Sequence, residues 1–436
     1  MSLNKYKLAD IAKIEISGVD KKTIEGEIPV RLCNFVDVYY NWAITKEKAK
    51  SFMVASAKQT EIDKCSIGKG MVAITKDSET RDDIGVATYI ADDFDNVVLG
   101  YHCALIIPNS AVVDGKYLNA FMHTRYIQKY FENNASGSGQ RYTLSNDTIG
   151  NIPVLLPSID EQHTIGKVLA DIDRKIELNK RINDNLEAMA KQLYDYWFVQ
   201  FDFPNEEGKP YKSSGGTMVW NEKLKREIPQ GWDISDVKSL IEPIERGVSY
   251  SSDEILDTSA TPMINLACFS KAGNYRLGEM KYFSGNIPET KLISPMDMLI
   301  ACTDMTQGAD IIGRPILVSN EFEQYTFSTD LALVIPKGKL KMYLYYTLRT
   351  PFYHKYIRPF ASGTTVKHLN LIGVENYVLP IPPTGIQSKF EDTISPIKEQ
   401  QSKNLNEIVE LTKQRDELLP LLMNGQASVN YHLSDD

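Results

Sequence analysis

The feature that most constrains the fold is a long heptad pattern between Leu155 and Trp197. One heptad position is occupied by Ile165, Ile172, Asn179, Leu186 and Leu193, and a second by Val168, Lys175, Ile182, Met189 and Tyr196. This spacing predicts a long helix of coiled-coil type. At about 1.5 Å per residue, such a helix is a rod of roughly 60 Å. A rod of that length cannot bury its apolar stripe inside one small domain, so it requires a second long helix.

The chain supplies that helix in its second half, where Gln387 matches Gln162. The equivalent stripe is formed by Phe390, Ile397, Asn404, Leu411 and Leu418. Asn179 and Asn404 fall on equivalent positions, where a polar residue either fixes the register of the pair or is a solvated defect. Pro396 lacks a backbone donor, and we expect it to kink the second helix or delay its start.

The repeat extends beyond the helices, and the separation between matching stretches stays nearly constant along the chain. The matched stretches are Tyr6–Ile11 with Trp232–Val237, Gly70–Thr75 with Asp297–Cys302, Ala104–Pro108 with Ala332–Pro336, Tyr117 with Tyr343, and Ala135–Gly137 with Ala361–Gly363. Each half therefore reads as a strand-rich α/β globule followed by a long helix. We expect a pseudo-twofold arrangement in which the helices pair antiparallel and separate the two globules.

The repeat also gives domain boundaries. They are a first globule at 1–157, a central long helix at 158–203, a joint and second globule at 204–382, a C-terminal long helix at 383–425, and a tail at 426–436. Gly, Pro and Ser mark the joint as irregular, but its aromatic residues indicate that it packs against the rest of the protein.

Composition excludes several classes of protein. The five cysteines are scattered without paired spacing, which argues against a zinc site or a disulfide framework. No run of eighteen apolar residues and no signal-peptide pattern is present, so we expect a cytoplasmic protein without a membrane partner. No phosphate loop, dinucleotide-binding motif, methyltransferase tetrapeptide or HExxH pair occurs either. These absences argue against catalysis, a metal site and a bound cofactor in this chain, with a nuclease site among carboxylates such as Asp82, Asp83, Asp92 and Asp93 as the alternative.

The charge is unevenly distributed along the chain. The net charge of −9 lies mostly on the helical segments, with −5 for 158–207 and −4 for 383–436. Between Leu331 and Val374 there are seven lysine and arginine residues and no acidic residue. Such a stripe is suited to phosphate contact, although a solvated helix face has the same pattern.

A Gly/Ser loop with basic and aromatic neighbours precedes the last strand of each half. Its candidate DNA-contacting residues are Ser138, Gln140, Arg141 and Tyr142 in the first copy, and Thr364, Thr365, Lys367 and His368 in the second. Hydroxyl and cationic groups bond phosphate oxygens, and Gln and Arg also fit the edges of adenine and guanine. An ordinary polar turn is the alternative.

Other loops supply weaker candidates for nucleic-acid contact. They are Tyr40, Lys76, Arg81, Tyr275, Arg276, Thr303 and Arg314. The two halves share a framework but differ in the chemistry of these loops. That combination suits a protein that reads two different DNA half-sites.

The chain resembles the specificity subunit of type I restriction–modification enzymes over essentially its whole length. The residues that carry this resemblance are Leu156–Gln162 with the helix through Phe198, and the joint stretches Phe201–Pro204, Gly208–Gly216 and Arg226–Trp232. The second copy departs from the pattern, because Thr384–Gln387 has no acidic residue before the glutamine.

The resemblance implies that the globules are target-recognition domains, each reading one half of a bipartite, asymmetric sequence in double-stranded DNA. The long helices would act as a spacer and as the docking surface for two methyltransferase subunits, with two restriction subunits outside them. S-adenosylmethionine, ATP and Mg²⁺ would belong to those partners. A two-lobed adaptor that binds proteins and lacks DNA specificity is the alternative from another class.

Overall fold

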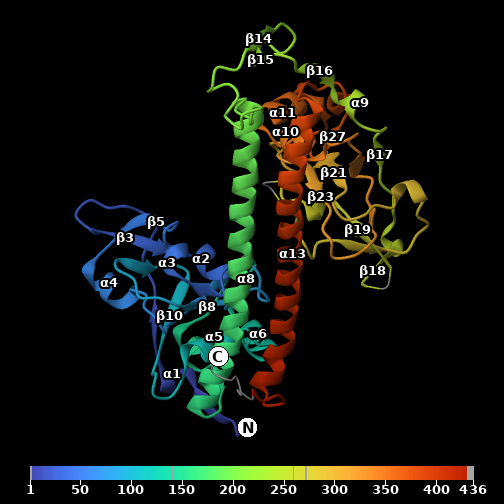
Figure 1. The fold of residues 1–436 in the computed structure, drawn as a ribbon. Coiled ribbons are helices and arrows are strands. Elements are labelled where there is room, and N and C mark those ends of the chain that lie inside the picture. The colour runs from blue at the N-terminus through green and yellow to red at the C-terminus, as the bar shows by residue number, and fades with distance from the viewer. Residues whose placement is uncertain (1, 140, 259, 271–272, 430–436) are drawn as a thin grey trace. The chain divides into compact units, whose positions relative to one another are not determined.

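The computed structural model describes residues 2–139, 141–258, 260–270 and 273–429, and its contacts divide the chain into two units. Unit 1 comprises Met1–Ile176 with Leu411–Asp436, and unit 2 comprises Glu177–Glu410. Each unit holds one strand-rich globule and part of both long helices, α8 (Ile159–Tyr194) and α13 (Thr384–Met423) (Figure 1). The expected α/β class, with two strand-rich regions and two long helices packed together, is confirmed.

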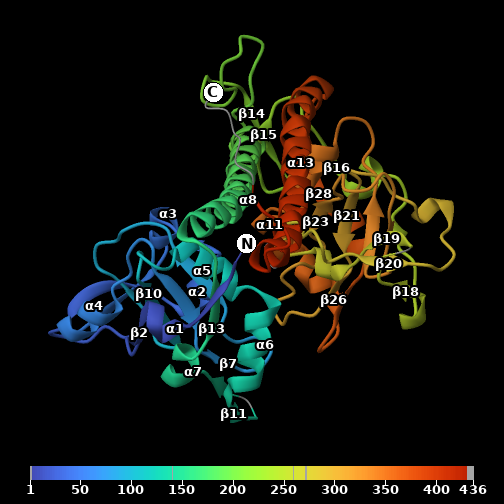
Figure 2. The ribbon, with the colours of Figure 1, turned by 90° about the horizontal axis from the view of Figure 1, so that it is seen from below.

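Unit 1 is built on a mixed five-stranded sheet in the order β2-β10-β6-β8-β4. Its strands are β2 (Ala12–Ile16), β10 (Cys103–Pro108), β6 (Val72–Thr75), β8 (Ala87–Ile90) and β4 (Ala43–Ile44). Every residue of β6 and β8 is buried, because helices and a second sheet cover the two faces. The helix α5 (Gly115–Met122) packs on β6 and β8 and is seen from below in Figure 2.

Three smaller sheets complete unit 1. They are β5 (Met53–Ala57) with β3 (Ile28–Cys33) and β9 (Val97–Leu99), β11 (Ser136–Ser138) with β12 (Arg141–Thr143) and β7 (Asp77–Ser78), and β1 (Asn4–Lys7) with β13 (Pro153–Leu156). The remaining helices are α1 (Leu8–Ile11), α2 (Phe35–Tyr39), α3 (Lys46–Ala49), α4 (Gln59–Cys65), α6 (Arg125–Asn134) and α7 (Asn146–Gly150).

Unit 2 repeats this plan with shorter strands. Its main sheet has the order β17 (Glu245–Arg246), β25 (Leu331–Val334), β21 (Met298–Ala301) and β23 (Pro315–Leu317). The others are β18 (Ile255–Leu256), β20 (Lys281–Phe283), β19 (Thr261–Ile264) and β24 (Thr326–Phe327); β22 (Thr303–Asp304), β27 (Lys367–Leu369) and β26 (Ala361–Ser362); β16 (Asp233–Asp236) with β28 (Val378–Ile381); and β14 (Met218–Asn221) with β15 (Arg226–Pro229). Its short helices are α9 (Val237–Leu240), α10 (Lys341–Thr347), α11 (Pro351–Ile357) and α12 (Ile372–Glu375).

Matched side-chain contacts confirm the internal repeat. The Tyr117 hydroxyl donates to the Leu155 carbonyl at 2.7 Å in unit 1, and the Tyr343 hydroxyl donates to the Pro380 carbonyl in unit 2. Likewise, the side-chain amide of Gln162 donates to the Pro157 carbonyl, and that of Gln387 to the Pro382 carbonyl. The same hydrogen bonds therefore fix the last strand and the start of the long helix in both copies.

The buried face of α8 corrects one of the two predicted heptad columns. Ile165 and Asn179 of the first column are buried, and Ile172, Leu186 and Leu193 are half-buried. The second column is wrong by one residue: the helix buries Leu169, Ile176, Asn183, Ala190 and Trp197 instead. In the predicted column Lys175, Ile182 and Met189 are exposed. A column that contains Lys175 would have buried an ammonium group, whereas the column one residue later contains no charged residue.

The second long helix also differs from expectation near its start. Ile397, Leu411 and Leu418 are half-buried and Asn404 is buried, but α13 already begins at Thr384 and continues through Pro396. The expected delay at Pro396 is therefore wrong. The proline is exposed, and the buried residues Ile394 and Lys398 on either side of it hold this stretch of helix in place.

Within unit 2 the polar residues of the seam bond to one another across the helix pair. The Asn179 amide donates to Glu407 at 2.8 Å, and the Asn404 amide donates to Asn183 at 2.8 Å. Gln401 and Asn183 also exchange hydrogen bonds with each other's backbone carbonyls. Of the two readings left open by the sequence, solvated defects are excluded, because the asparagines are buried and paired. Such pairs penalise a shifted alignment and fix an antiparallel register.

The joint packs as its aromatic residues suggest. A π-helical turn at Asp195–Val199 ends α8, and Phe201, Phe203 and Trp232 are all buried in the main core of unit 2. The Trp232 ring contacts both phenylalanine rings, with centroids 5.4 Å from Phe201 and 5.2 Å from Phe203. The joint is therefore part of the packed unit and is not a free linker.

Candidate nucleic-acid interface

The first candidate surface is the hairpin β11–β12, which pairs with β7 at an edge of unit 1 (Figure 2). The register places Tyr142 opposite Ser78 and Thr143 opposite Asp77. Gly137 has a φ of 132°, and a Cβ there would lie 2.2 Å from the Arg141 carbonyl oxygen. The hairpin thus requires glycine at this position, and the sequence Ser-Gly-Ser folds back and brings Arg141 beside β7.

A cluster of basic side chains surrounds Asp77 next to this hairpin. One carboxylate oxygen of Asp77 lies 3.1 Å from Lys76 Nζ, 2.5 Å from His102 Nδ1 and 3.6 Å from Arg141 Nη2. Burial alone would raise the pKa of Asp77, but hydrogen bonds from Thr143, His102 and Lys76 outweigh it and lower the pKa to about 2. Asp77 is therefore a carboxylate at neutral pH, and it holds Arg141 in place while the guanidinium stays 58% exposed.

Aromatic rings flank the same cluster. Arg81 lies over the ring of Tyr142 at 5.1 Å, and Lys76 lies over the ring of Tyr101 at 5.7 Å. Tyr101 is itself 43% exposed and contacts the His102 ring edge-on. Cations and aromatic faces presented together are typical of surfaces that contact phosphates and bases.

The structure thus brings together four of the predicted residues of the first half, namely Lys76, Arg81, Arg141 and Tyr142. Tyr40 is 75% exposed and contacts Tyr39, whose hydroxyl bonds Asp83. Gln140 lies outside the described residues. For Ser138 the structure gives only its place in β11, opposite Arg141.

Sequence reasoning missed the residues that organise this cluster. Asp77 lies on β7, and Tyr101 and His102 lie in the turn before β10, both distant in sequence from the Gly/Ser loop. His102 has a left-handed backbone with a φ of 73°, which turns its ring toward Asp77. A non-glycine residue in this conformation is uncommon, but the sequence carries no sign of it. The available signal for this cluster was the pair Lys76–Asp77, which directly follows the buried strand β6.

In unit 2 the matching hairpin has different chemistry. Thr303 pairs with His368 and Asp304 with Lys367. Asp304 is fully buried and accepts from the backbone N–H groups of Thr306 and Ile311, both at 2.7 Å. The Lys367 ammonium donates instead to the Gly363 carbonyl at 2.6 Å. The buried aspartate therefore shapes a turn here, and within the described part of the chain it forms no ion pair.

The other predicted residues of unit 2 are scattered over it. Thr364, Thr365 and His368 are exposed, whereas Thr303 is only 5% exposed and offers little surface for DNA. Tyr275 packs against a hydrophobic core and Arg276 forms an ion pair with Glu279. The structure does not gather these residues into one site.

Unit 2 has a basic cavity of about 730 Å³. Sequence reasoning named Arg314 and Lys367 as candidate contacts and marked further lining residues only as part of the basic stripe. The cavity is lined by Lys191, Gln307, Ala309, Arg314, Arg349, Pro351, His354, Lys355, Arg358, Pro359, Ala361 and Lys367. No carboxylate is among them. Burial lowers the pKa of His354, whose ring bonds the Ala309 carbonyl. The positive charge at neutral pH thus comes from the lysines and arginines, many of them from the basic stripe of the sequence.

The equivalent helix of unit 1, α6, keeps a lysine at the position of Lys355 (Lys129) but has less positive charge around it. When the two copies are aligned on Tyr117 and Tyr343, His354 corresponds to Gln128 and Arg358 to Glu132. Glu132 in turn pairs with Arg125 at 3.0 Å. In unit 1 the cations therefore surround Asp77, while in unit 2 they come from several elements, with Lys355 on α11 and Arg358 in the turn after it. The two globules share a topology and offer different surfaces.

Two general findings concern the described residues. Within them, no group of three or more His, Cys, Asp or Glu side chains could hold a metal ion, and each of the five cysteines is buried. None of the helices in the described ranges is both long and apolar enough to cross a membrane.

Comparison with known proteins agrees with this architecture. A family model described as "Type I restriction modification DNA specificity domain" matches residues 3–188 and 229–412. The MjaIX specificity subunit of Methanocaldococcus jannaschii, a type I restriction enzyme subunit, is 28% identical over 334 residues, covering 74% of this chain and 71% of that protein. The HindI specificity subunit of Haemophilus influenzae is 23% identical over 405 residues, covering 80% and 85%. The crystal structure of a type I system S subunit from M. genitalium shares the fold, with a TM-score of 0.61 at 14% identity over 97% of this chain and 96% of that one.

Proposed function

Because the chain belongs to the specificity subunits of type I restriction–modification systems, we propose that it reads a bipartite, asymmetric DNA target through its two target-recognition domains. Members of this family are non-catalytic subunits that supply the DNA specificity of the complex. The proposal assigns one half-site to the globule of unit 1 and the other to the globule of unit 2. The hairpin surfaces described above would face the DNA.

The observation that carries this proposal is the combination of equal topology with unequal surface chemistry. Both globules present a glycine-requiring hairpin, at Gly137 and at Gly363, where a Cβ would lie 2.0 to 2.2 Å from a carbonyl oxygen. The scaffold therefore places a loop at the same point of each domain. The loops carry Arg141 in one case and Lys367 in the other, so that the two domains can distinguish different bases.

Within each domain we assign different roles to different cations. In unit 2, Lys355 and Arg358 on and after α11 line the same basic cavity as Lys367 of the hairpin and suit contact with the DNA backbone. In unit 1, Arg141 is held by Asp77 and projects from the hairpin, as a base-reading side chain requires. Phosphate contacts set affinity and position, and base contacts set sequence.

The long helices are proposed as the docking surface for two methyltransferase subunits, with two restriction subunits beyond them. On α8 the exposed apolar residues Leu178, Ile182 and Met189 lie along one face and are not used in the helix pair. The negative charge of both helical segments disfavours DNA there. S-adenosylmethionine, ATP and Mg²⁺ would be used by the partner subunits. Because its target is DNA, the proposal places the complex in the cytoplasm.

The first test is a map of adenine methylation in a methylation-free host. The host expresses the methyltransferase subunit with this chain or without it. We expect a two-part motif with a fixed gap that requires this chain. If both proteins co-purify and no new motif arises, the chain does not direct methylation, and a protein-binding adaptor takes its place.

Loop variants test the assignment of the surfaces. Arg141→Ala and Lys367→Ala should each weaken methylation of the target while the complex with the methyltransferase still co-purifies. If either change abolished co-purification, its loop would belong to the assembly surface and not to the DNA surface.

A further inference from the structure

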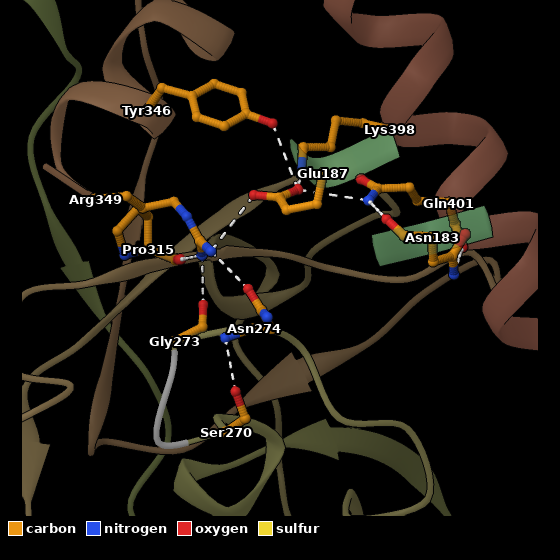
Figure 3. A network of polar contacts seen from close by, with 10 residues as sticks. All are labelled: Asn183, Glu187, Ser270, Gly273, Asn274, Pro315, Tyr346, Arg349, Lys398 and Gln401. Carbon is orange, nitrogen blue, oxygen red and sulfur yellow. Dashed lines mark hydrogen bonds and ion pairs between the residues drawn. The ribbon is translucent and has the colours of Figure 1, made fainter. Parts of the chain in front are cut away.

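A buried charged network ties both long helices to the recognition globule within unit 2. Glu187 of α8 pairs with Lys398 of α13 and with Arg349, which follows α10, at 3.5 Å. Gln401 of α13 donates to the same carboxylate and to the Asn183 carbonyl of α8 (Figure 3). One carboxylate thus joins two helices and one globule.

The network is deep enough for its charges to matter. The side chains of Lys398, Arg349 and Glu187 are 7%, 14% and 24% exposed. Burial alone would raise the pKa of Glu187, but Lys398 and Arg349 outweigh it and lower that pKa. The carboxylate is therefore ionised at neutral pH. Breaking a buried pair leaves an uncompensated charge, so the geometry of this junction is held more tightly than packing alone would hold it.

Arg349 carries the network into the globule. Its guanidinium donates to the Gly273 carbonyl at 2.5 Å, to the Asn274 side chain at 2.6 Å and to the Pro315 carbonyl at 3.4 Å (Figure 3). A Cβ built on Gly273 would lie 3.0 Å from Arg314 Cδ, so this turn and Arg314 are in contact distance. Arg349 and Arg314 both line the basic cavity. The chain of contacts therefore runs from the spacer helix to the surface proposed to face DNA.

We infer that Glu187 is a positioning residue for one half-site: it holds Arg349, and through Arg349 the Gly273–Asn274 turn and Arg314, in the geometry that base discrimination by unit 2 requires. The inference rests on the proposed function, because it takes the globule of unit 2 to read DNA. It goes beyond that function by giving the spacer helix a part in sequence discrimination. Glu187 itself is not placed in contact with DNA.

The corresponding junction of unit 1 has different chemistry. Asp173 stands at the position equivalent to Lys398 when the copies are aligned on Gln162 and Gln387, and His123 stands at the position equivalent to Arg349. Arg415 of α13 pairs with Asp173 at 3.8 Å and lies 4.7 Å over the Trp42 ring, which stacks on His123. Burial and Arg415 together lower the pKa of His123 to about 4. In unit 1, Arg415 of the helix links the helices to the globule, as Arg349 of the globule does in unit 2. Each domain therefore has its own junction.

The test measures methylation rates of the purified methyltransferase complex on duplexes with single base changes in each half of the target. We compare wild type with Glu187→Gln, Asn274→Ala and Arg415→Gln. For Glu187→Gln we expect discrimination at one half-site to fall about tenfold, which is the size of one weakened base contact, and discrimination at the other to change less than twofold. Asn274→Ala should affect the same half-site, and Arg415→Gln the opposite one.

Asn274→Ala keeps the test informative if Glu187→Gln does not fold, because Asn274 is exposed and its loss removes only one link from Arg349. Asp184→Asn is the matched control, since it removes an exposed carboxylate from the same helix, and it should leave both half-sites unchanged. Rescue of discrimination by Glu187→Asp would support a positional role.

Three outcomes overturn the inference. Discrimination could be unchanged in both Glu187→Gln and Asn274→Ala. The rates could fall equally on all duplexes, as a purely structural role predicts. Both half-sites could respond alike to the same variant. Failure of the proposed function is a separate result, because the wild-type complex would then show no sequence preference at all.

Discussion

The Asp77 cluster gives a prediction whose size follows from the structure. The change is Asp77→Asn, which keeps the shape of the side chain and removes its charge. Lys76, His102 and Arg141 would then surround an uncharged amide, whose nitrogen cannot accept their hydrogen bonds. Asp83→Asn is the control, because Asp83 is exposed and accepts its hydrogen bond from the Tyr39 hydroxyl.

The magnitude comes from the pKa of Asp77, which is lowered from 3.8 to about 2. One pKa unit is about 1.4 kcal/mol, so the charged form contributes at most about 2.5 kcal/mol to the stability of unit 1 at neutral pH. The folded pKa lies below the unfolded one, so this contribution is complete above about pH 4 and is lost as the pH falls through about 2. Roughly 1 kcal/mol should remain at pH 3.

The assay is hydrogen exchange at the amides of β7 and β12 at pH 7 and pH 3, which reports the free energy of opening of this sheet. At pH 7, Asp77→Asn should lower that free energy by about 2 kcal/mol, and the difference from wild type should shrink at pH 3. Asp83→Asn should change it by less than about 0.5 kcal/mol. Equal protection of wild type and Asp77→Asn at pH 7, or a difference that grows at pH 3, would refute the reasoning.

Three further predictions concern other parts of the chain. Arg358→Gln should weaken DNA binding similarly for all sequences and reduce the slope of log K against log salt by about 0.9, measured by binding titrations at several salt concentrations. Gly137→Ala should lower methylation of the target, because its Cβ would meet the Arg141 carbonyl oxygen, while the amount of complex recovered with the methyltransferase stays the same. Asn404→Leu should lower the free energy of unfolding by about 1–3 kcal/mol in urea titrations, because it leaves the buried Asn183 amide oxygen without its donor.

The fold could be predicted because the sequence contains two copies of the same pattern of strands and helices. Matching stretches at a nearly constant separation give the same strands and helices in both halves, and pairs such as Tyr117 with Tyr343 make the same hydrogen bond in each. A single copy would have left many of these short strands ambiguous. Agreement between two independent copies removes much of that ambiguity.

The second heptad column shows where pattern reading failed. From the first column at Ile165, an apolar stripe can continue through the residue three or the residue four positions later. Val168 and Leu169 are both apolar, so the first turn does not decide between them. Lys175 against Ile176 does decide, since Ile176 is 4% exposed and Lys175 is exposed. If Lys175 had been given more weight, the second heptad column would have been placed one residue later.

The candidate site was predicted best in unit 1, where the hairpin that is repeated in both copies also carries the basic and aromatic side chains. Arg141 and Tyr142 lie on the predicted hairpin, and Lys76 and Arg81 come next to it because β12 pairs with β7. In unit 2 the same reasoning selected Thr303, which is buried, because the position and not the residue is repeated. Repetition in sequence preserves where a side chain stands and does not preserve whether it is exposed.

The two globules differ because the repeat preserves the strands and turns but not the side chains that they carry. Asp77 and Asp304 both lie on the strand that pairs with the hairpin, opposite Thr143 and Lys367, yet one binds three basic side chains and the other binds two backbone N–H groups. Because Asp304 already satisfies its own turn, the cations of unit 2 have to be held elsewhere, and Arg349 is held by Glu187 of the long helix. One domain therefore anchors its cation within the globule, and the other anchors it on the spacer. A change at Glu187 should therefore reach base reading in unit 2 through Arg349, whereas Arg141 in unit 1 is held by Asp77 and does not depend on that carboxylate.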